Sequence, residues 1–190
     1  MKIIILDRDG VINYDSREYI KSPDEWHAIP GSLDAIAKLN KVGYKVIVAT
    51  NQSGIARKLY DLKTLHQIHE KMLRELKQHH GHIEEIFFCP HHPVDNCICR
   101  KPKPGMLHQI QQKYGVRFQD TFFIGDTPSD IEAATAVGCK PLLVLTGDKQ
   151  KLLDHAVDLM TVPHFENLAA AVEYVTKPSS RGRVSGRGDP

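Results

Sequence analysis

The segment IIILDRDG, residues 3–10, carries the main clue to the fold, because four apolar residues run directly into two acids and a glycine. Short β-branched runs that are apolar at every position are typical of strands buried on both faces of a parallel sheet. Further short runs of this kind follow along the chain, the last of them weaker: residues 44–49, 86–88, 122–124, 142–145 and 159–162. The sequence therefore predicts a sheet of short, buried strands.

Amphipathic segments with helical period separate these runs. Four of them begin at a capping residue or a proline and stop at a glycine: Ser32 to Gly43, Asp61 to Gly81, Pro104 to Gly115 and Thr127 to Gly138. A fifth covers residues 166–176. Because strand and helix alternate, we predict an α/β fold with a doubly wound, Rossmann-like parallel sheet.

Residues capable of chemistry follow each of the first four predicted strands. Asp7 and Asp9 follow the first strand, Thr50 the second, Cys89 the third and Asp126 the fourth. In doubly wound sheets, ligands bind beyond the carboxyl ends of the strands. We therefore expect these side chains to gather at one edge of the sheet and to form the functional site.

The three aspartates at this edge predict a bound cation. Asp7, Asp9 and Asp126 would repel one another unless a cation lay between them. Oxygen ligands with open positions for water suit Mg²⁺, and Mg²⁺ beside an oxygen nucleophile is the usual apparatus of phosphoryl transfer. A single DxDG motif is more often only a polar turn in which Gly10 takes a positive φ angle. The phosphoryl-transfer interpretation gains weight because Thr50 offers a further phosphate-binding group.

Four motifs occur in a specific order: DxDG at residues 7–10, TN at 50–51, KP at 101–102 and GDxxxD at 125–130. In this order and spacing they resemble the haloacid dehalogenase-like phosphatases, and the motifs span most of the folded chain. The resemblance predicts the fold of that superfamily. Asp130 fits two roles: a member of the catalytic set, through the fourth motif, and the third residue of a helix capping box. The sequence leaves both roles open.

The resemblance implies a role for each of the central residues. Asp7 is the nucleophile that takes the phosphoryl group, and Asp9 gives a proton to the leaving alkoxide and later takes one from water. Thr50 and Lys101 hold the transferring phosphoryl group. Asp126 binds Mg²⁺ together with Asp7 and the backbone carbonyl of Asp9.

Three cysteines and a histidine crowd into eleven residues and form a second candidate metal site: Cys89, His91, Cys97 and Cys99. Three thiolates and an imidazole are a standard tetrahedral set for structural Zn²⁺. Two buried cysteines among loop residues are the plainer alternative, but this segment has almost nothing apolar to bury. His92 competes with His91 as the fourth ligand, whereas Cys139 fits a small core residue better.

The cysteine loop and the RKPKPGM segment at residues 100–106 narrow the resemblance to one branch of the superfamily. That branch contains the phosphatases that remove the C7 phosphate of D-glycero-D-manno-heptose 1,7-bisphosphate, on the way to ADP-heptose and the lipopolysaccharide core, and the histidinol-phosphate phosphatases. Its members are capless, cytoplasmic and typically monomeric. The small gaps between the motifs leave no room for a large cap domain here, and a zinc-closed loop would fix where Arg100 and Lys101 point.

The branch implies a small phosphorylated sugar as substrate, and residues near the motifs are candidates to bind it: Asp15, Tyr19, Asn51, Gln52, Ser53, Arg57, Arg100 and Thr127. The phosphate that stays on the product needs cations, for which Arg57, Arg100 and Lys103 are candidates. Ser53 fits an ordinary Ser-Gly turn equally well. Thr127 and Lys58 stand where lysine and glycine are frequent in the branch, so the preferred anomer stays open.

Composition and charge argue against other classes of protein. The 190 residues are 41% hydrophobic and 25% charged, which fits one globular domain; we place it at residues 1–176, with a disordered basic tail at 177–190. The net charge is +2, of which the tail contributes +3, so the remaining −1 disfavours a zinc-stabilised nucleic-acid-binding module. The chain lacks an apolar run of membrane-span length, a signal-peptide core and a GxxxxGK[ST] loop. We therefore expect a cytoplasmic phosphatase that binds neither membrane nor nucleic acid.

Overall fold

A single parallel sheet forms the centre of the computed structural model, which describes residues 2–147 and 161–177. Six strands lie in the order β3-β2-β1-β4-β5-β6. Their bounds are β1 Lys2–Leu6, β2 Tyr44–Asn51, β3 Glu85–Cys89, β4 Phe122–Gly125, β5 Lys140–Val144 and β6 His164–Phe165. The first five strands lie at the predicted runs, which confirms the predicted α/β class.

The sixth strand differs from its prediction. It begins at His164, after Pro163, rather than within residues 159–162, of which 159 and 160 lie outside the described residues. Proline has no N–H for a strand ladder, so the ordered pairing starts beyond it. Pro163 still takes part through its carbonyl, which accepts a hydrogen bond from the Leu143 N–H at 3.0 Å.

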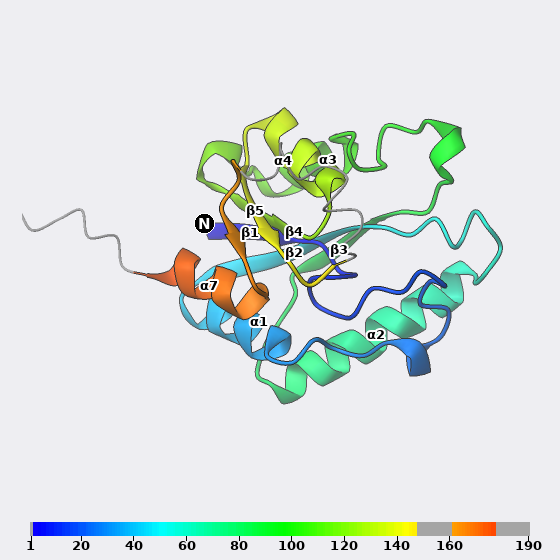
Figure 1. Ribbon diagram of the computed structural model, residues 1–190, viewed down its shortest axis with the longest axis horizontal. Helices are drawn as coiled ribbons and strands as arrows, with labels where there is room; N and C mark the ends of the chain where they lie inside the picture. Colours follow the sequence, from blue (N-terminus) through cyan, green and yellow to red (C-terminus); the bar gives the residue numbers. More distant parts are fainter. Residues whose placement is uncertain (1, 148–160, 178–190) are drawn as a thin grey trace, which may run out of the picture.

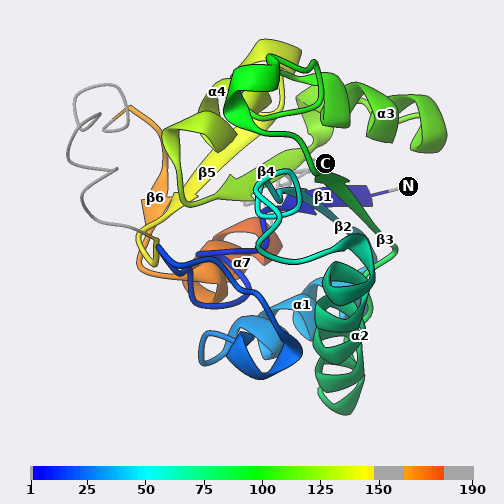
Figure 2. The same cartoon turned by 90° about the vertical axis from the view of Figure 1, so that its right-hand side faces the viewer.

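Helices cover both faces of the sheet. The α-helices are α1 Ser32–Lys41, α2 Leu62–Gln78, α3 Gly105–Tyr114, α4 Pro128–Val137 and α7 Leu168–Thr176. Short 3₁₀ turns are η1 Pro23–Glu25, η2 Pro93–Asp95 and η3 Phe118–Asp120. Figures 1 and 2 show α1, α2 and α7 on one face and α3 and α4 on the other, which is the doubly wound arrangement.

Alternate residues of the central strand supply the two cores. Ile4 and Leu6 belong to the cluster that β1 shares with α1, α2 and α7, whereas Ile3 and Ile5 belong to the cluster shared with α3 and α4. All four side chains are nearly or fully buried. A strand that buries both faces has to be apolar at every position, and this explains why residues 3–6 show no alternation.

The helix starts follow the predicted signals except at α1 and α7, and α7 begins at Leu168 with Asn167 as its cap rather than at residue 166. Asp61 caps α2 by accepting the Thr64 N–H at 2.7 Å. The predicted cap Ser32 is instead the first residue of α1, and Gly31, at φ 81°, occupies the cap position. The Ser32 hydroxyl donates to the Ile12 carbonyl at 2.6 Å, and the same carbonyl accepts the Ile29 N–H at 2.9 Å, so the hydroxyl ties the start of α1 to the loop after β1.

The strand order reverses between β1 and β4, and this junction positions the site. From β1 the chain adds β2 and then β3 on one side, and it returns to place β4 on the other side. The Asp7 N–H donates to the Ile124 carbonyl at 2.9 Å, so the ends of β1 and β4 are tied together. A crevice opens beyond the carboxyl ends of strands at such a reversal.

The crevice is open, as the sequence predicted for a capless fold. Among the described residues no separate cap domain covers it, and its walls come from the segments that follow β1, β2, β3 and β4. Within the same residues, no helix is both long enough and apolar enough to cross a bilayer. Residues 178–190 of the predicted tail lie outside the described part of the chain.

Candidate active site

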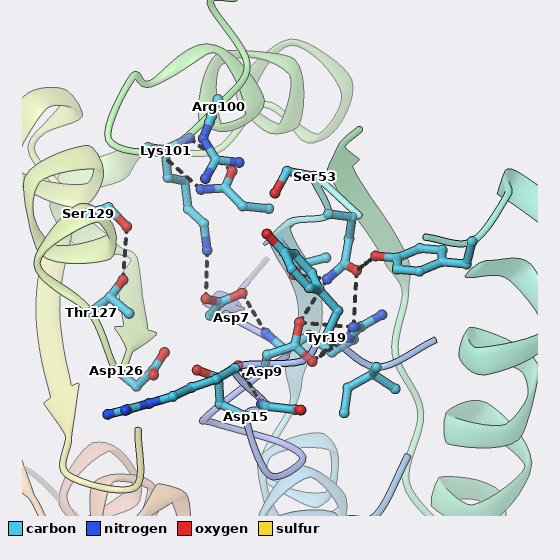
Figure 3. Close-up of a pocket in the computed structure, with 18 residues that line it drawn as sticks. Asp7, Asp9, Asp15, Tyr19, Ser53, Arg100, Lys101, Asp126, Thr127 and Ser129 are labelled. Carbon is cyan, nitrogen blue, oxygen red and sulfur yellow. Dashed lines mark hydrogen bonds and ion pairs between the residues drawn. The ribbon is translucent and has the colours of Figure 1, made fainter. Parts of the chain in front are cut away.

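Lys101 lies in the crevice with its side chain directed at Asp7 (Figure 3), and it connects two carboxylates. Its Nζ lies 2.8 Å from Asp7 Oδ2 and 2.6 Å from Asp130 Oδ1, and it donates to the Ala49 carbonyl at 2.8 Å. Burial lowers the pKa of Lys101, but the charges of Asp130 and Asp7 outweigh burial and raise it, so the amine stays protonated. Each of the three ammonium hydrogens has a protein acceptor, and one of these acceptors is the Asp7 carboxylate.

Asp130 fills both of the roles that the sequence left open. Its Oδ2 accepts the N–H of Thr127 at 3.0 Å and the Thr127 hydroxyl at 2.6 Å, which completes the capping box of α4. Its Oδ1 faces Lys101. One buried carboxylate thus fixes the β4–α4 turn and the lysine at the same time.

Asp126 adds a third buried carboxylate with an unused acceptor. Oxygens of Asp7, Asp126 and Asp130 lie within 4.8 Å of one another. Burial, followed by the charges of Asp130 and Asp7, raises the pKa of Asp126 well above its usual range. Burial also raises the pKa of Asp7 to about 7, against the opposing effect of Lys101. Within the described residues, Asp126 Oδ1 has no hydrogen-bond partner.

These features fit a divalent cation held by oxygen ligands. A cation between Asp7 and Asp126 would offset their repulsion, lower both pKa values and occupy the free acceptor of Asp126. The backbone leaves room for that carboxylate at Gly10, which has φ 77°. A Cβ atom at Gly10 would lie 2.2 Å from Asp126 Oδ2, so no other residue fits there without displacing the carboxylate.

Asp9 lies beside Asp7 in a dense set of hydrogen bonds. Its carboxylate accepts from Arg8, Asn13 and Gln52, and 21% of its side chain remains exposed in the crevice. Burial raises the pKa of Asp9, but the Arg8 charge and these hydrogen bonds outweigh burial and hold the pKa below its usual range. Before substrate arrives, Asp9 is therefore an oriented carboxylate.

Two adjacent residues at the end of β2 have different tasks. Thr50 Oγ1 accepts from Gln52 Nε2 at 2.9 Å, so its own hydroxyl hydrogen remains available to a phosphate oxygen. Asn51 clamps the backbone of Lys101: its Nδ2 donates to the Lys101 carbonyl at 3.1 Å, and its Oδ1 accepts the Lys101 N–H at 3.1 Å. Asn51 therefore holds the backbone of Lys101 in addition to lining the crevice.

The crevice is a polar cavity of about 380 Å³, and its walls contain seven of the eight predicted substrate-binding residues: Asp15, Tyr19, Asn51, Gln52, Ser53, Arg100 and Thr127. The eighth, Arg57, does not line it and instead lies over the Tyr19 ring, 5.9 Å from the centroid. Tyr19 has φ 64°, an unusual angle for a residue other than glycine. Asp7, Asp9, Lys101 and Asp126 also line this cavity.

The four predicted zinc ligands converge at the end of β3. Cys89 Sγ lies 3.5 Å from Cys97 Sγ, 3.3 Å from Cys99 Sγ and 3.5 Å from His91 Nδ1. These are about the separations of atoms around one tetrahedral ion. His92 points elsewhere: its Nδ1 accepts the Val94 N–H at 3.3 Å and caps η2. The geometry therefore favours His91 over His92.

The ligand chemistry also fits a soft cation. Burial raises the pKa of the Cys89 thiol to about 12, so this thiol keeps its proton unless a metal displaces it. Arg100 follows Cys99 directly and lines the cavity, and its buried Nη1 has no hydrogen-bond partner within the described residues. The cysteine loop thus presents to the crevice a guanidinium group with one buried, unpaired nitrogen.

Several residues of the cavity did not emerge from the sequence. Arg8, Tyr60 and Ser129 line it, and His69 contacts Arg8 from α2. Arg8 has a signal in the sequence, since a cation between the two acids of one motif favours ion pairing with them. His69 gave another, because it interrupts the apolar face of α2 beside Ile68.

Comparison with known proteins agrees with the geometry of the site. A family model described as HAD-hydrolase-like matches residues 98–171. The chain is 51% identical over 170 residues to a D-glycero-beta-D-manno-heptose-1,7-bisphosphate 7-phosphatase of Pseudomonas putida, covering 90% of this chain and 97% of that protein. It is 53% identical to the protein of the same name from Bordetella bronchiseptica, over 80% of this chain and 86% of that one.

Solved structures are similar over nearly the whole chain. The D,D-heptose 1,7-bisphosphate phosphatase of B. bronchiseptica, crystallised with magnesium and phosphate, has a TM-score of 0.88 and 49% identity, covering 92% of this chain and 98% of that one. The corresponding phosphatase of Burkholderia thailandensis has a TM-score of 0.73 and 39% identity, covering 93% and 100%.

Proposed function

The chain belongs to the family of D-glycero-beta-D-manno-heptose-1,7-bisphosphate 7-phosphatases, and from this premise we propose how its residues release the C7 phosphate of that sugar. The reaction hydrolyses a phosphoric monoester and leaves heptose 1-phosphate and inorganic phosphate. In the cell, the product would serve ADP-heptose and lipopolysaccharide core synthesis in the cytoplasm. The protein acts as a monomer on this small phosphorylated sugar, without nucleic acid or membrane.

The first step is transfer of the phosphoryl group to Asp7. An oxygen of the Asp7 carboxylate attacks the phosphorus, the bond between phosphorus and the C7 oxygen breaks, and the leaving alkoxide takes a proton from Asp9. The incoming phosphate dianion raises the pKa of Asp9, which favours the protonated form that this step needs. The Thr50 hydroxyl donates to a phosphate oxygen, and the charge of Lys101 stabilises the crowded anions.

The second step is hydrolysis of the aspartyl-phosphate. Asp9, now a carboxylate, takes a proton from a water molecule as the water oxygen attacks phosphorus. The bond between phosphorus and the Asp7 oxygen breaks, and inorganic phosphate leaves. Asp7 returns to the carboxylate that pairs with Lys101.

Two metals complete the site in this proposal. Asp7, Asp126 and the carbonyl of Asp9 would hold Mg²⁺, which supplies charge neutralisation for the phosphoryl group; the magnesium in the B. bronchiseptica structure and the unpaired Asp126 oxygen support this assignment. Cys89, His91, Cys97 and Cys99 would hold Zn²⁺ in a structural role. Zinc held there would close the loop that carries Arg100 and Lys101, and it would influence substrate binding without touching the reacting atoms.

One observation carries the mechanistic proposal more than any other. Asp7 follows β1 at the strand reversal, pairs with Lys101 at 2.8 Å, and lies beside an Asp126 oxygen that has no hydrogen-bond partner within the described residues. A nucleophile, a buried cation and a vacant oxygen ligand at one strand end are the parts that phosphoryl transfer through an aspartate requires.

The deciding experiment compares two substrates of the branch. Purified protein with Mg²⁺ is given the heptose 1,7-bisphosphate or histidinol phosphate, and released phosphate and the remaining ester are measured. We expect rapid phosphate release from the bisphosphate and a product that retains its C1 phosphate. Faster turnover of histidinol phosphate, or loss of the C1 phosphate first, would overturn the proposal.

A further inference from the structure

The side-chain amide of Gln52 is buried and makes four hydrogen bonds. Its Nε2 donates to Asp9 Oδ2 at 2.8 Å and to Thr50 Oγ1 at 2.9 Å. Its Oε1 accepts the Tyr60 hydroxyl at 2.7 Å and Arg8 Nη2 at 3.1 Å. Only 3% of Gln52 is exposed, and these four partners use both hydrogens of its amide nitrogen and two acceptor positions of its oxygen.

These partners also determine which way the amide points. The guanidinium of Arg8 can only donate and therefore requires the amide oxygen on its side, where this oxygen also accepts the Tyr60 hydroxyl. The amide N–H₂ group must then face Asp9 and Thr50, which are the residues assigned to proton transfer and to phosphate binding. A flipped amide would place its N–H₂ group against the donors of Arg8 and its oxygen against the Asp9 carboxylate, so Asp9 would lose this bond.

Arg8 holds the same carboxylate from another direction. Its Nε lies 3.0 Å from Asp9 Oδ1, and its Nη2 lies 2.9 Å from both oxygens of Asp9. Its Nη1 lies 3.1 Å from His69 Nε2, and Arg8 itself is 1% exposed. Because guanidinium is planar, contacts on three of its corners fix the plane in which the Asp9 carboxylate is held.

The tyrosine reaches this set through a special feature of the loop after β2. A Cβ atom at Gly54 would lie 2.2 Å from the Tyr60 ring, so the ring occupies space that only glycine leaves free. Tyr60 is 8% exposed. The loop thus places a hydroxyl group behind Gln52, on the side of the amide away from Asp9.

From these contacts we propose that Gln52, Tyr60 and Arg8 are positioning residues that hold the Asp9 carboxylate for proton transfer, with Tyr60 acting through Gln52. The inference rests on the role of Asp9 in the proposed function. Tyr60 needs no contact with the reacting atoms for this role. Its removal misaligns the proton donor while the phosphate site stays in place.

The test uses substituted phenyl phosphates whose leaving groups differ in basicity. A basic leaving group needs a proton from Asp9, whereas p-nitrophenolate leaves as a stable anion, and neither substrate carries a distal phosphate. For Tyr60→Phe, we expect kcat/KM on phenyl phosphate to fall about 3- to 10-fold and on p-nitrophenyl phosphate by less than about 2-fold. For Gln52→Leu, we expect losses of about 10- to 100-fold and about 2- to 5-fold.

The double variant separates action through Gln52 from direct contact with substrate. If Tyr60 acts through Gln52, then Tyr60→Phe has no further effect in the Gln52→Leu background. Additive losses would overturn the proposal, as would equal losses of Tyr60→Phe on all leaving groups. Tyr60→Phe removes a single hydroxyl group, so it provides a folded protein for this test even where Gln52→Leu melts early.

Two controls complete the design. Tyr114→Phe also removes one hydroxyl group, which donates to Glu85 at 2.7 Å away from the crevice, and it should leave the dependence on leaving group unchanged. Asp9→Asn should show the steepest dependence of all. If Asp9→Asn shows no dependence on the leaving group, the proposed role of Asp9 fails. If Asp9→Asn is the only variant that shows this dependence, the positioning role fails and the role of Asp9 stands.

Discussion

The crevice and the cysteine loop both bring charged or metal-binding side chains together, but they are held in place differently. Asp7, Lys101, Asp126 and Asp130 are at most 8% exposed and follow strands of the buried sheet or pack against them. In the cysteine loop, Val94 is 80% exposed and Ile98 is 76% exposed. Apolar packing of the sheet therefore fixes the crevice, whereas the loop buries too little to fix itself.

Because of this difference, a metal ion would have a different effect in each region. In the crevice, a cation would relieve repulsion within a framework that already exists. In the loop, a cation would itself hold the structure together, because the loop converges mainly at its four ligand atoms. Damage to the crevice should therefore remove activity without unfolding, and damage to the loop should loosen structure and change activity only through Arg100 and Lys101.

The largest effect is expected for Asp7→Asn. The variant removes the nucleophile, so kcat should fall by about 10⁴-fold or more. Its melting temperature should stay the same or rise, since the loss of one charge relieves the repulsion that raises the pKa of Asp126. Phosphate release and thermal unfolding measure the two quantities. Asp24→Asn, at an exposed acid, is the control, and appreciable turnover by Asp7→Asn would show that another group attacks phosphorus.

The next effect is expected for Cys97→Ser, which breaks the loop. It should abolish bound zinc and destabilise the protein by about 3 kcal/mol, comparable to opening a cross-link of similar loop length. KM for the bisphosphate should rise because Arg100 loosens, while the Mg²⁺ requirement stays. Metal analysis and denaturant unfolding check this. Cys139→Ala, at a buried cysteine outside the loop, should keep one zinc per chain; equal zinc content in both variants contradicts the assignment.

A smaller, selective effect is expected for Arg100→Ala, which connects the two regions. Losing one charge-assisted phosphate contact should cost about 1.5–3 kcal/mol, or roughly 10- to 100-fold in kcat/KM for the bisphosphate. For p-nitrophenyl phosphate, which has no second phosphate, the change should be small. Lys103→Ala removes a charge whose Nζ bonds the Asn96 carbonyl at 2.7 Å, and it should spare both substrates. Equal losses for Arg100→Ala would move Arg100 into the phosphoryl-transfer site.

The effect that is smallest at neutral pH concerns acid stability and belongs to the crevice. Burial, helped by the Arg8 charge, lowers the pKa of His69 to about 3. The unfolded chain binds that proton near pH 6.5, so between about pH 6.5 and 3 the unfolded state holds more protons and stability falls as pH falls. The slope should be at most about 1.4 kcal/mol per pH unit from this group.

His69→Gln, which keeps an acceptor for Arg8, should flatten this slope. The measurement is the free energy of unfolding in urea at several pH values. His82→Gln, at an exposed histidine, is the control and should retain the slope of the natural protein. A His69→Gln variant with an unchanged slope would place the acid sensitivity elsewhere.

The sequence predicted the strands and the site edge well because both depend on local signals. Runs without alternation mark strands buried on two faces, and parallel strands bring their carboxyl ends together by geometry. The same reasoning predicted that Asp7 and Asp126 would lie side by side. Asp130 shows the limit of such reasoning, since one carboxylate satisfies two patterns that the sequence presents as alternatives.

Other features depend on contacts between distant segments and leave little trace in the sequence. The four hydrogen bonds of Gln52 involve partners from three segments, and no spacing rule brings Tyr60 behind it. Arg57 lies over the Tyr19 ring, so the loop after β2 contacts the loop after β1. Composition does not predict this contact. Of the predicted strand at 159–162, the described residues 161 and 162 are not strand, and the pairing begins at His164, beyond a proline at 163 that the sequence did contain.

The central claim, that Asp7 carries the phosphoryl group, has a direct test. The protein is mixed with Mg²⁺ and the bisphosphate, quenched in acid within one turnover, digested and analysed by mass spectrometry. We predict one added phosphoryl group on the peptide that contains Asp7, and none in Asp7→Asn. A phosphoryl group on another residue, or its absence during a turnover in which sugar product has already formed, would contradict the account.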